Sequence, residues 1–419
     1  SEQRPPGPER PVFRRRRRPA PDAPEWSSDA QEVLFESPVE VGADGLPTGV
    51  ELEEPADEPE ETAESFDPES ISIETETTTV DSLLSRLRDG RIDLAPDFQR
   101  RPGIWSDAQQ SRLIESLLLR IPVPSFYMAQ QKNDDWSVVD GIQRLTAIAR
   151  FMAPETVGMR PLALRGLDYL GRFHKKTYRE LPGRLRIRLR ETQLIVHIVR
   201  HSTPEPVKFN VFSRINTGGL PLTRQEIRHA MIPGRARDFL ADLAEDPAFG
   251  EATGWSVSSE RMADREMVLR FLAFRFFPPV EYRQHDFDQF LTAAMHRVNR
   301  MSDAERRQAA REFREAMKYA HRIFGVQAFR KSIASGRRSP VNRALFETLA
   351  VNLAALDDHE RERLVALRDD VLSGFHRLMQ DWDFERAISI ATGDPRRVRT
   401  RFEAVGELFR RVLRKCGGD

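Results

Sequence analysis

The chain has 419 residues, of which 39% are hydrophobic, and it carries 65 Lys+Arg and 65 Asp+Glu. This length suffices for about two or three domains with sizeable cores. We find no apolar run of about 18 residues and no apolar stretch after the N-terminal arginines, so we expect neither a membrane span nor a signal peptide. Cys416 is the only cysteine, which excludes disulfides within the chain and thiolate metal sites and is typical of a reducing compartment. We therefore expect a cytoplasmic protein.

The charge is distributed unevenly along the chain. Residues 1–70 hold 7 Lys+Arg and 19 Asp+Glu, whereas the remainder holds 58 and 46. A basic body with an acidic tail indicates nucleic acid or nucleotide phosphates as partners, although a tail that only solubilises the body gives the same pattern. Residues 1–70 are also rich in Pro, Glu and Asp, with an arginine run over 14–18. We predict that they are disordered, because they bury too little apolar surface to offset chain entropy.

After residue 70 the sequence alternates between strand-like and helix-like patterns. The predicted elements are, in chain order, a strand over 71–75, a helix over 80–87, a helix starting at 106, strands over 125–129 and 136–139, a helix over 142–152 and a strand over 194–199. Ser106 and Gln109 have the spacing of a capping box, which fixes the start of the second helix. This mixture predicts a small α/β or α+β domain.

The pattern becomes helical from Thr203-Pro204 onward. That helix ends at residues 216–219, where Asn and Gly tolerate positive φ. Thr223 and Glu226 have capping-box spacing, so we interpret Glu226 as structural. Helical periodicity then dominates residues 260–413. The predicted fold class is α+β, organised as a disordered acidic tail over 1–70, an α+β domain over 71–235 and an all-helical C-terminal domain over 236–419.

The segment from Val138 to Leu145 is the most informative for function. A β-branched strand ends in Asp140-Gly141 and runs directly into a helix. The first N–H groups of a helix have no intrahelical partner, and its dipole places partial positive charge there, which favours a phosphate. Gly141 would let that phosphate approach the backbone, and Arg144 would reach it from one turn further on. An ordinary turn followed by a surface ion pair explains the same residues.

Two other segments have a distinctive pattern of charged residues. Arginines alternate with apolar residues over 184–190, and either a DNA-binding stripe or a solvated, ion-paired face explains them. Asp264, Glu266 and Arg270 begin a predicted helix, and we interpret them as acid-first charge patterning along that helix.

Four segments of the chain, taken in order, carry a resemblance to a known family. They are Pro96–Arg100, Trp105–Leu118, Asp140–Arg144 and Phe212–Arg228. The series resembles the N-terminal domain of GmrSD-type restriction endonucleases, a prokaryotic family related to ParB and sulfiredoxin, over about residues 72–275. The resemblance implies a ParB/sulfiredoxin-like fold that binds, and in characterised branches hydrolyses, a nucleoside triphosphate in defence against modified or phage DNA.

Roles for individual residues follow from the resemblance together with the junction. Asp140 would place a metal ion or a water, and Gln143 would orient the attacking water, which makes these two the candidate catalytic residues. The nucleotide would be held by Gly141, Arg144, Gln99, Arg100 and Asn216. A loop role explains Gln99 and Arg100 equally well, and a helix-terminating turn explains Asn216. Mg²⁺, with Asp140 as its candidate ligand, would bridge the phosphates.

The chain departs from the family pattern at two places. Ile142 stands where the family centre, DGQQR, has its first Gln, which puts hydrolysis in more doubt than binding. Residues 276–419 also lack the His-Asn-His spacing of the nuclease domain that often follows in the family, so we do not expect autonomous cleavage of that type. The histidines there fit helix surfaces better: His285, His296, His321, His359 and His376.

The sequence supports two functional hypotheses from different classes. The first is an NTP-binding component, with NTPase activity as the leading enzyme hypothesis, of a prokaryotic anti-phage or DNA-modification-sensing system. The second is a non-enzymatic, ParB-like DNA-binding or adaptor protein. A sulfiredoxin-like reductase is disfavoured, because Cys416 is remote from the centre. The expected partners are a nucleotide and DNA, contacted directly or through another protein, without membrane contact and with a homo-oligomer left open.

Overall fold

The computed structural model describes residues 38–42, 45–54, 67–94, 105–215, 222–283, 286–331 and 339–415. All of these belong to one compact unit, Ser37–Asp419. Within the described ranges, no helix has the length and apolar character needed to cross a membrane.

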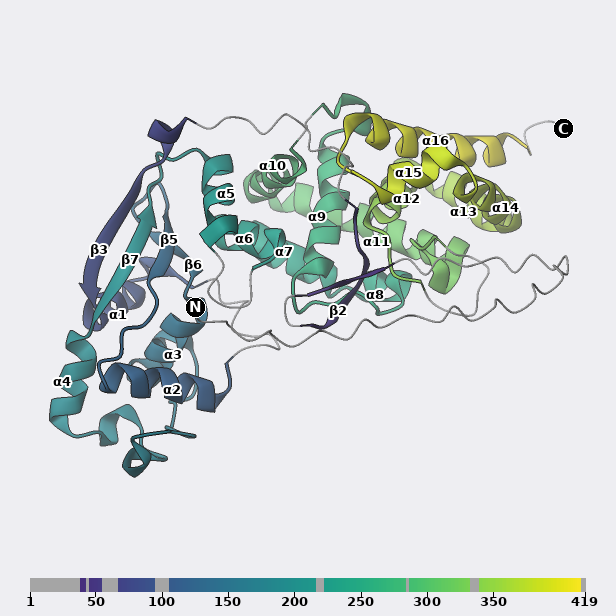
Figure 1. The fold of residues 1–419 in the computed structure, drawn as a ribbon. Helices are drawn as coiled ribbons and strands as arrows, with labels where there is room; N and C mark the ends of the chain where they lie inside the picture. Colours follow the sequence, from purple (N-terminus) through teal and green to yellow (C-terminus); the bar gives the residue numbers. More distant parts are fainter. Residues whose placement is uncertain are drawn as a thin grey trace, which may run out of the picture. The chain divides into compact units, whose positions relative to one another are not determined.

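A mixed five-stranded sheet forms the centre of the α+β part (Figure 1). Its strands are β3 (Ile73–Thr79), β4 (Ile92–Asp93), β5 (Phe126–Gln130), β6 (Trp136–Asp140) and β7 (Gln193–Val199). They lie in the order β3-β7-β5-β6-β4. The pairs β3–β7 and β5–β6 are antiparallel, whereas β7–β5 and β6–β4 are parallel. The sheet therefore joins strands from both ends of this part of the chain.

Helices of the α+β part pack beside this sheet, and they begin and end where local signals place them. They are α1 (Val80–Arg88), α2 (Asp107–Leu118), α3 (Ile142–Met152), α4 (Gly183–Glu191), α5 (Glu205–Ile215) and α6 (Arg224–Met231). Both predicted capping boxes are present, at Ser106 with Gln109 and at Thr223 with Glu226. Glu226 also pairs with Arg261 at 2.9 Å, which confirms its structural interpretation.

The second half of the described chain is helical, as predicted. Its helices are α7 (Arg235–Ala244), α8 (Pro247–Thr253), α9 (Ala263–Phe276), α10 (Phe287–Arg300), α11 (Asp303–Phe324), α12 (Arg343–Ala355), α13 (Asp358–Ala366), α14 (Arg368–Met379), α15 (Trp382–Ser389) and α16 (Pro395–Arg414). Short 3₁₀ turns occur at Pro68–Ser70, Pro154–Val157, Gly171–Phe173, Tyr178–Glu180, Pro279–Glu281 and Gly325–Gln327.

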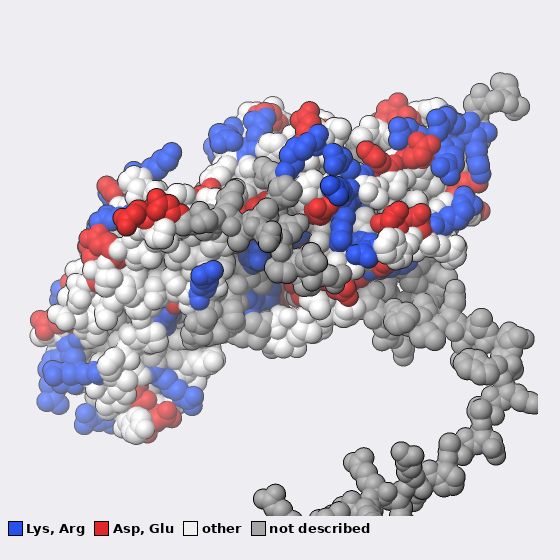
Figure 2. All heavy atoms as spheres, turned by 45° about the horizontal axis from the view of Figure 1, so that its top comes forward, with Lys and Arg blue, Asp and Glu red and all other residues white. Residues whose placement is uncertain are grey.

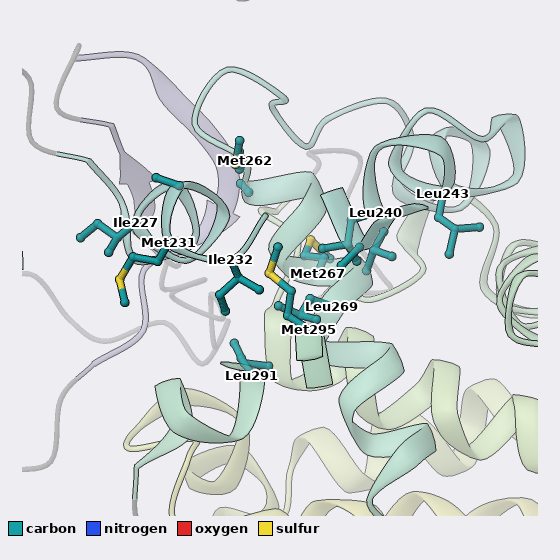
Figure 3. Close-up of a cluster of buried hydrophobic side chains, with 14 of the residues drawn as sticks. Ile227, Met231, Ile232, Leu240, Leu243, Met262, Met267, Leu269, Leu291 and Met295 are labelled. Atoms are coloured by element: carbon teal, nitrogen blue, oxygen red, sulfur yellow. The ribbon is translucent and has the colours of Figure 1, made fainter. Parts of the chain in front are cut away.

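One hydrophobic core connects the sheet with the helical half. Figure 3 shows part of it, where Ile232, the residue after α6, lies between Met231 of α6 and Met267 of α9. Residues on both sides of position 235 therefore contribute to the same apolar cluster. The boundary between separate domains at residue 235 stays a prediction.

The prediction that residues 1–70 are disordered throughout is wrong for residues 38–42 and 45–54. We call these residues the N-terminal strap. It forms the antiparallel strands β1 (Val39–Val41) and β2 (Pro47–Glu51). Val50 is fully buried and forms a parallel bridge with Val341, while Glu54 bridges to Ile390. The helical half is thus completed by an N-terminal strand. The sequence signal failed because the strand partners of the strap, Val341 and Ile390, lie far away in the sequence.

Candidate functional site

The junction between β6 and α3 has the backbone geometry that the sequence predicts. Gly141 is the N-cap of α3, with a left-handed φ of 96°, and no side chain caps this helix end. At α2 and α6, in contrast, a capping box bonds the first N–H groups. The start of α3 therefore leaves backbone donors that no cap side chain engages, at the positive end of the helix dipole.

Arg144 lies one turn into α3, but its guanidinium is already engaged by the protein. Nη1 donates to the carbonyls of Pro124 and Ser125, the latter at 3.1 Å, and Nη2 donates to Asp140 Oδ2 at 2.9 Å. The guanidinium carbon also lies 4.9 Å from the Phe126 ring centroid. Burial lowers the pKa of Arg144, and the neighbouring Asp140 opposes that shift. A phosphate at this junction would have to compete with the Asp140–Arg144 pair.

The other residues of the predicted centre separate into two environments. Asp140 is about one-third exposed, at 34% of its side chain, so it can be reached from solvent. Gln143 Oε1 accepts a hydrogen bond from the Trp105 N–H at 3.3 Å, which connects the centre to the start of α2. Ile142 is only 6% exposed and belongs to the hydrophobic core. The residue that departs from the family pattern therefore faces the core.

A row of polar side chains runs across neighbouring strands of the sheet and ends at Asp140. We did not predict this row from the sequence. Strand register places Asp140 beside Tyr127, Tyr127 beside His197 and His197 beside Thr75. The Tyr127 and His197 rings stack with centroids 4.7 Å apart, and Thr75 Oγ1 bonds His197 Nδ1 at 2.8 Å. Only the strand order creates this row, because its members come from strands far apart in the sequence.

Three of the predicted nucleotide-binding residues, Gln99, Arg100 and Asn216, lie outside the described residues. The structure thus brings together Asp140, Gly141, Gln143 and Arg144, while the other three positions stay predictions.

Metal ligands are sparse in the part of the chain that the structure describes. No group of three or more His, Cys, Asp or Glu side chains is placed to hold a metal ion there. His296 bonds Glu205 at 2.8 Å, and His376 bonds Gln380. At the junction, Asp140 is the carboxylate available to Mg²⁺. One carboxylate suffices when phosphates complete the coordination of this ion.

Replacing Gly141 by Ala is expected to destabilise the protein by about 2–3 kcal/mol, through the left-handed φ and through a clash. An added Cβ would lie 2.5 Å from Cδ1 of Phe126. Gly158→Ala is the matched control, because φ is 61° there and nothing lies within 4 Å of the added Cβ. It should cost only about 1–2 kcal/mol. Urea unfolding measures both values, and equal losses would contradict the role of Phe126.

The fold and the junction define a mixed-sheet domain with a strand–Gly–helix turn at which no side chain caps the helix. Residues 80–233 match the family model of the GmrSD restriction endonuclease N-terminal domain. Over these residues the chain is similar to the GmrSD N-terminal domain, which suggests a restriction-like phage defence system. No curated protein and no solved structure matches the chain, so a ParB/sulfiredoxin-like fold stays a prediction.

Proposed function

We propose that this chain binds a nucleoside triphosphate at the start of α3 as a component of a restriction-like defence system. The supporting observation is the uncapped N-terminus of α3 behind Gly141, inside the segment that matches the GmrSD family model. The free N–H groups would hold a phosphate, and Arg144 would neutralise it after release from Asp140. Mg²⁺ would be held by Asp140 and the phosphates.

Hydrolysis requires a further condition, since Gln143 must be free to orient water. In the structure its side-chain oxygen accepts from the Trp105 N–H, which leaves its amide nitrogen for a ligand. Asp140 and Arg144 form an ion pair with each other, so both side chains are engaged within the protein. This favours the second candidate function, an adaptor that binds DNA without turnover, with or without control by a nucleotide. Release of phosphate distinguishes these two functions.

A titration with fluorescent nucleoside triphosphates in the presence of Mg²⁺ tests the proposal. Wild type should bind at least one of them, and Arg144→Ala should weaken binding by about a hundredfold, because a charge-assisted bidentate contact is lost. Arg150→Ala is the matched control. It lies two turns further along α3, pairs with Asp107 at 2.6 Å and has a side chain 13% exposed, but it is distant from the helix start.

A second variant keeps the test informative if Arg144→Ala unfolds. Asp140→Asn preserves shape and should remove the Mg²⁺ dependence of binding and any phosphate release. Absence of nucleotide binding by the wild type, or equal losses in Arg144→Ala and Arg150→Ala at equal stability, would overturn the proposal. Binding without phosphate release would support the adaptor.

A further inference from the structure

Basic residues concentrate in the segment that leads into α4 and in α4 itself. Residues 160–190 contain ten Lys and Arg but only two Asp and Glu. Lys and Arg side chains gather around α4, at the lower left of Figure 2. Arg190 pairs with Asp81 at 2.9 Å, and Lys176 lies 4.0 Å from Glu180. Whether the face around α4 is ion-paired as a whole depends on the remaining Lys and Arg side chains of residues 160–190.

Most of these cations have no acidic neighbour. Among the described residues, six exposed cations of the segment have no carboxylate within ion-pair distance: Arg160, Arg172, Lys175, Arg179, Arg184 and Arg186. Arg184 and Arg186 are therefore solvated, as one interpretation of residues 184–190 predicts, but they are not ion-paired with a described residue. Self-repulsion among unpaired cations costs stability unless an anionic partner relieves it.

An exposed aromatic ring projects from the same segment on a fixed backbone. Tyr169 is 78% exposed. The buried carboxylate of Glu115 accepts the N–H groups of Asp168, Tyr169 and Leu170 at 2.9, 2.8 and 2.6 Å. Burial raises the pKa of Glu115, but these three hydrogen bonds outweigh it, so the net pKa lies below the usual value. The loop is thus held in one conformation that presents the Tyr169 ring to solvent.

Further bonds fix the rest of the loop to α2 and to itself. Ser111 Oγ accepts the Arg165 N–H at 2.9 Å, and Arg112 Nε donates to the Gly166 carbonyl at 3.3 Å. Leu164 exchanges backbone hydrogen bonds with residues 175 and 176. On α4, Ile187 is 54% exposed between Arg186 and Arg188. The Tyr169 ring, whose backbone is held in place, and the exposed Ile187 side chain thus belong to the same segment as the unpaired cations. This segment offers contacts to both apolar and anionic groups.

We propose that this α4 surface, made of Tyr169, Ile187 and the six unpaired cations, binds a nucleic-acid strand. The cations contact phosphates, and Tyr169 stacks on an unpaired base, which a duplex does not expose. Six exposed cations without acidic partners suit a polyanion, such as a nucleic-acid backbone, better than a single small anion. This proposal is independent of nucleotide binding at α3, because none of its residues belongs to the β6–α3 junction.

Fluorescence anisotropy with the full chain and labelled DNA, single-stranded and duplex, tests the surface. Wild type should bind the single strand more tightly, with an affinity that falls as salt rises. The double variant Arg184→Glu/Arg186→Glu should weaken binding at least tenfold and reduce the slope of log K against log salt by about 2. Tyr169→Ala should weaken single-strand binding by about tenfold and duplex binding much less.

The matched control is Arg396→Glu/Arg411→Glu on α16, which reverses two charges at exposed positions elsewhere on the molecule. Since all replaced side chains are exposed, melting temperatures should equal that of the wild type, and binding of nucleotide should be unchanged in every variant. Equal losses in the α4 and α16 pairs would overturn the proposal. The proposal would also be overturned if polyglutamate bound as tightly as DNA and if Tyr169→Ala left that binding unchanged. This result would indicate an acidic protein as the partner.

Discussion

Replacement of Arg401 by Met is expected to lower the free energy of unfolding by about 3–5 kcal/mol, because it leaves a buried carboxylate without its main partner. Arg401 of α16 and Glu347 of α12 pair with side chains that are both 0% exposed. Arg401 also donates to the carbonyls of Thr392, at 2.7 Å, and Ala387, at 3.3 Å. Urea unfolding at pH 7 measures the loss.

Two further variants separate the ion pair from general packing. Arg411→Met lies on the same helix at an exposed position and should change stability by less than about 0.5 kcal/mol. In the double variant Arg401→Met/Glu347→Met both charges are gone, so most of the lost stability should return. If the double variant is as unstable as the sum of the two single variants, the pair is not the cause.

The second large effect is expected at Glu53 of the N-terminal strap, where Glu53→Gln should destabilise the protein by about 2–3 kcal/mol at pH 7. Arg270 Nη1 and Nη2 donate to the two carboxylate oxygens at 3.0 and 3.1 Å, and Thr392 Oγ1 donates at 3.0 Å. Burial alone would raise the pKa of Glu53, but Arg270 and Arg343 outweigh it and lower the pKa to about 2.

The pH dependence of this effect has a defined sign. Because the folded-state pKa of Glu53 lies below its ordinary value of 4.5, its contribution is complete above that value and is lost as the pH falls towards 2. The stability difference between wild type and Glu53→Gln should therefore shrink over this range. Glu54→Gln is the control, since the next residue is exposed. Equal pH profiles for the two variants would show that the Arg270 contact contributes nothing specific.

The buried charges show where prediction from the sequence fails. The acid-first pattern of Asp264, Glu266 and Arg270 is present in α9, where Arg270 pairs with Glu266 at 2.9 Å. It did not predict that the Arg270 side chain is only 5% exposed. Its main partner, Glu53, is 217 residues away in the sequence. No local pattern encodes such a contact, and the acidic composition that predicted a disordered tail supplied the carboxylates for these buried arginines.

The elements themselves were largely predictable because their signals are local. Apolar alternation, helical periodicity and the capping boxes at Ser106 and Thr223 act within one or two turns, and the structure confirms them. The order of the strands was not predictable, because pairing depends on residues brought together by folding. For the same reason the sequence analysis missed the row from Thr75 to Asp140, with Tyr127 and His197 between them.

At the candidate site, the sequence by itself determined the strand–Gly–helix junction and the family of the domain. Both depend on short segments whose backbone is set by their own residues. Only the tertiary structure decided that Ile142 faces the core and that Arg144 is engaged by Pro124, Ser125 and Asp140. The direction of a side chain depends on its neighbours in space, and two of these neighbours, Pro124 and Ser125, lie before β5, outside the segment that forms the junction.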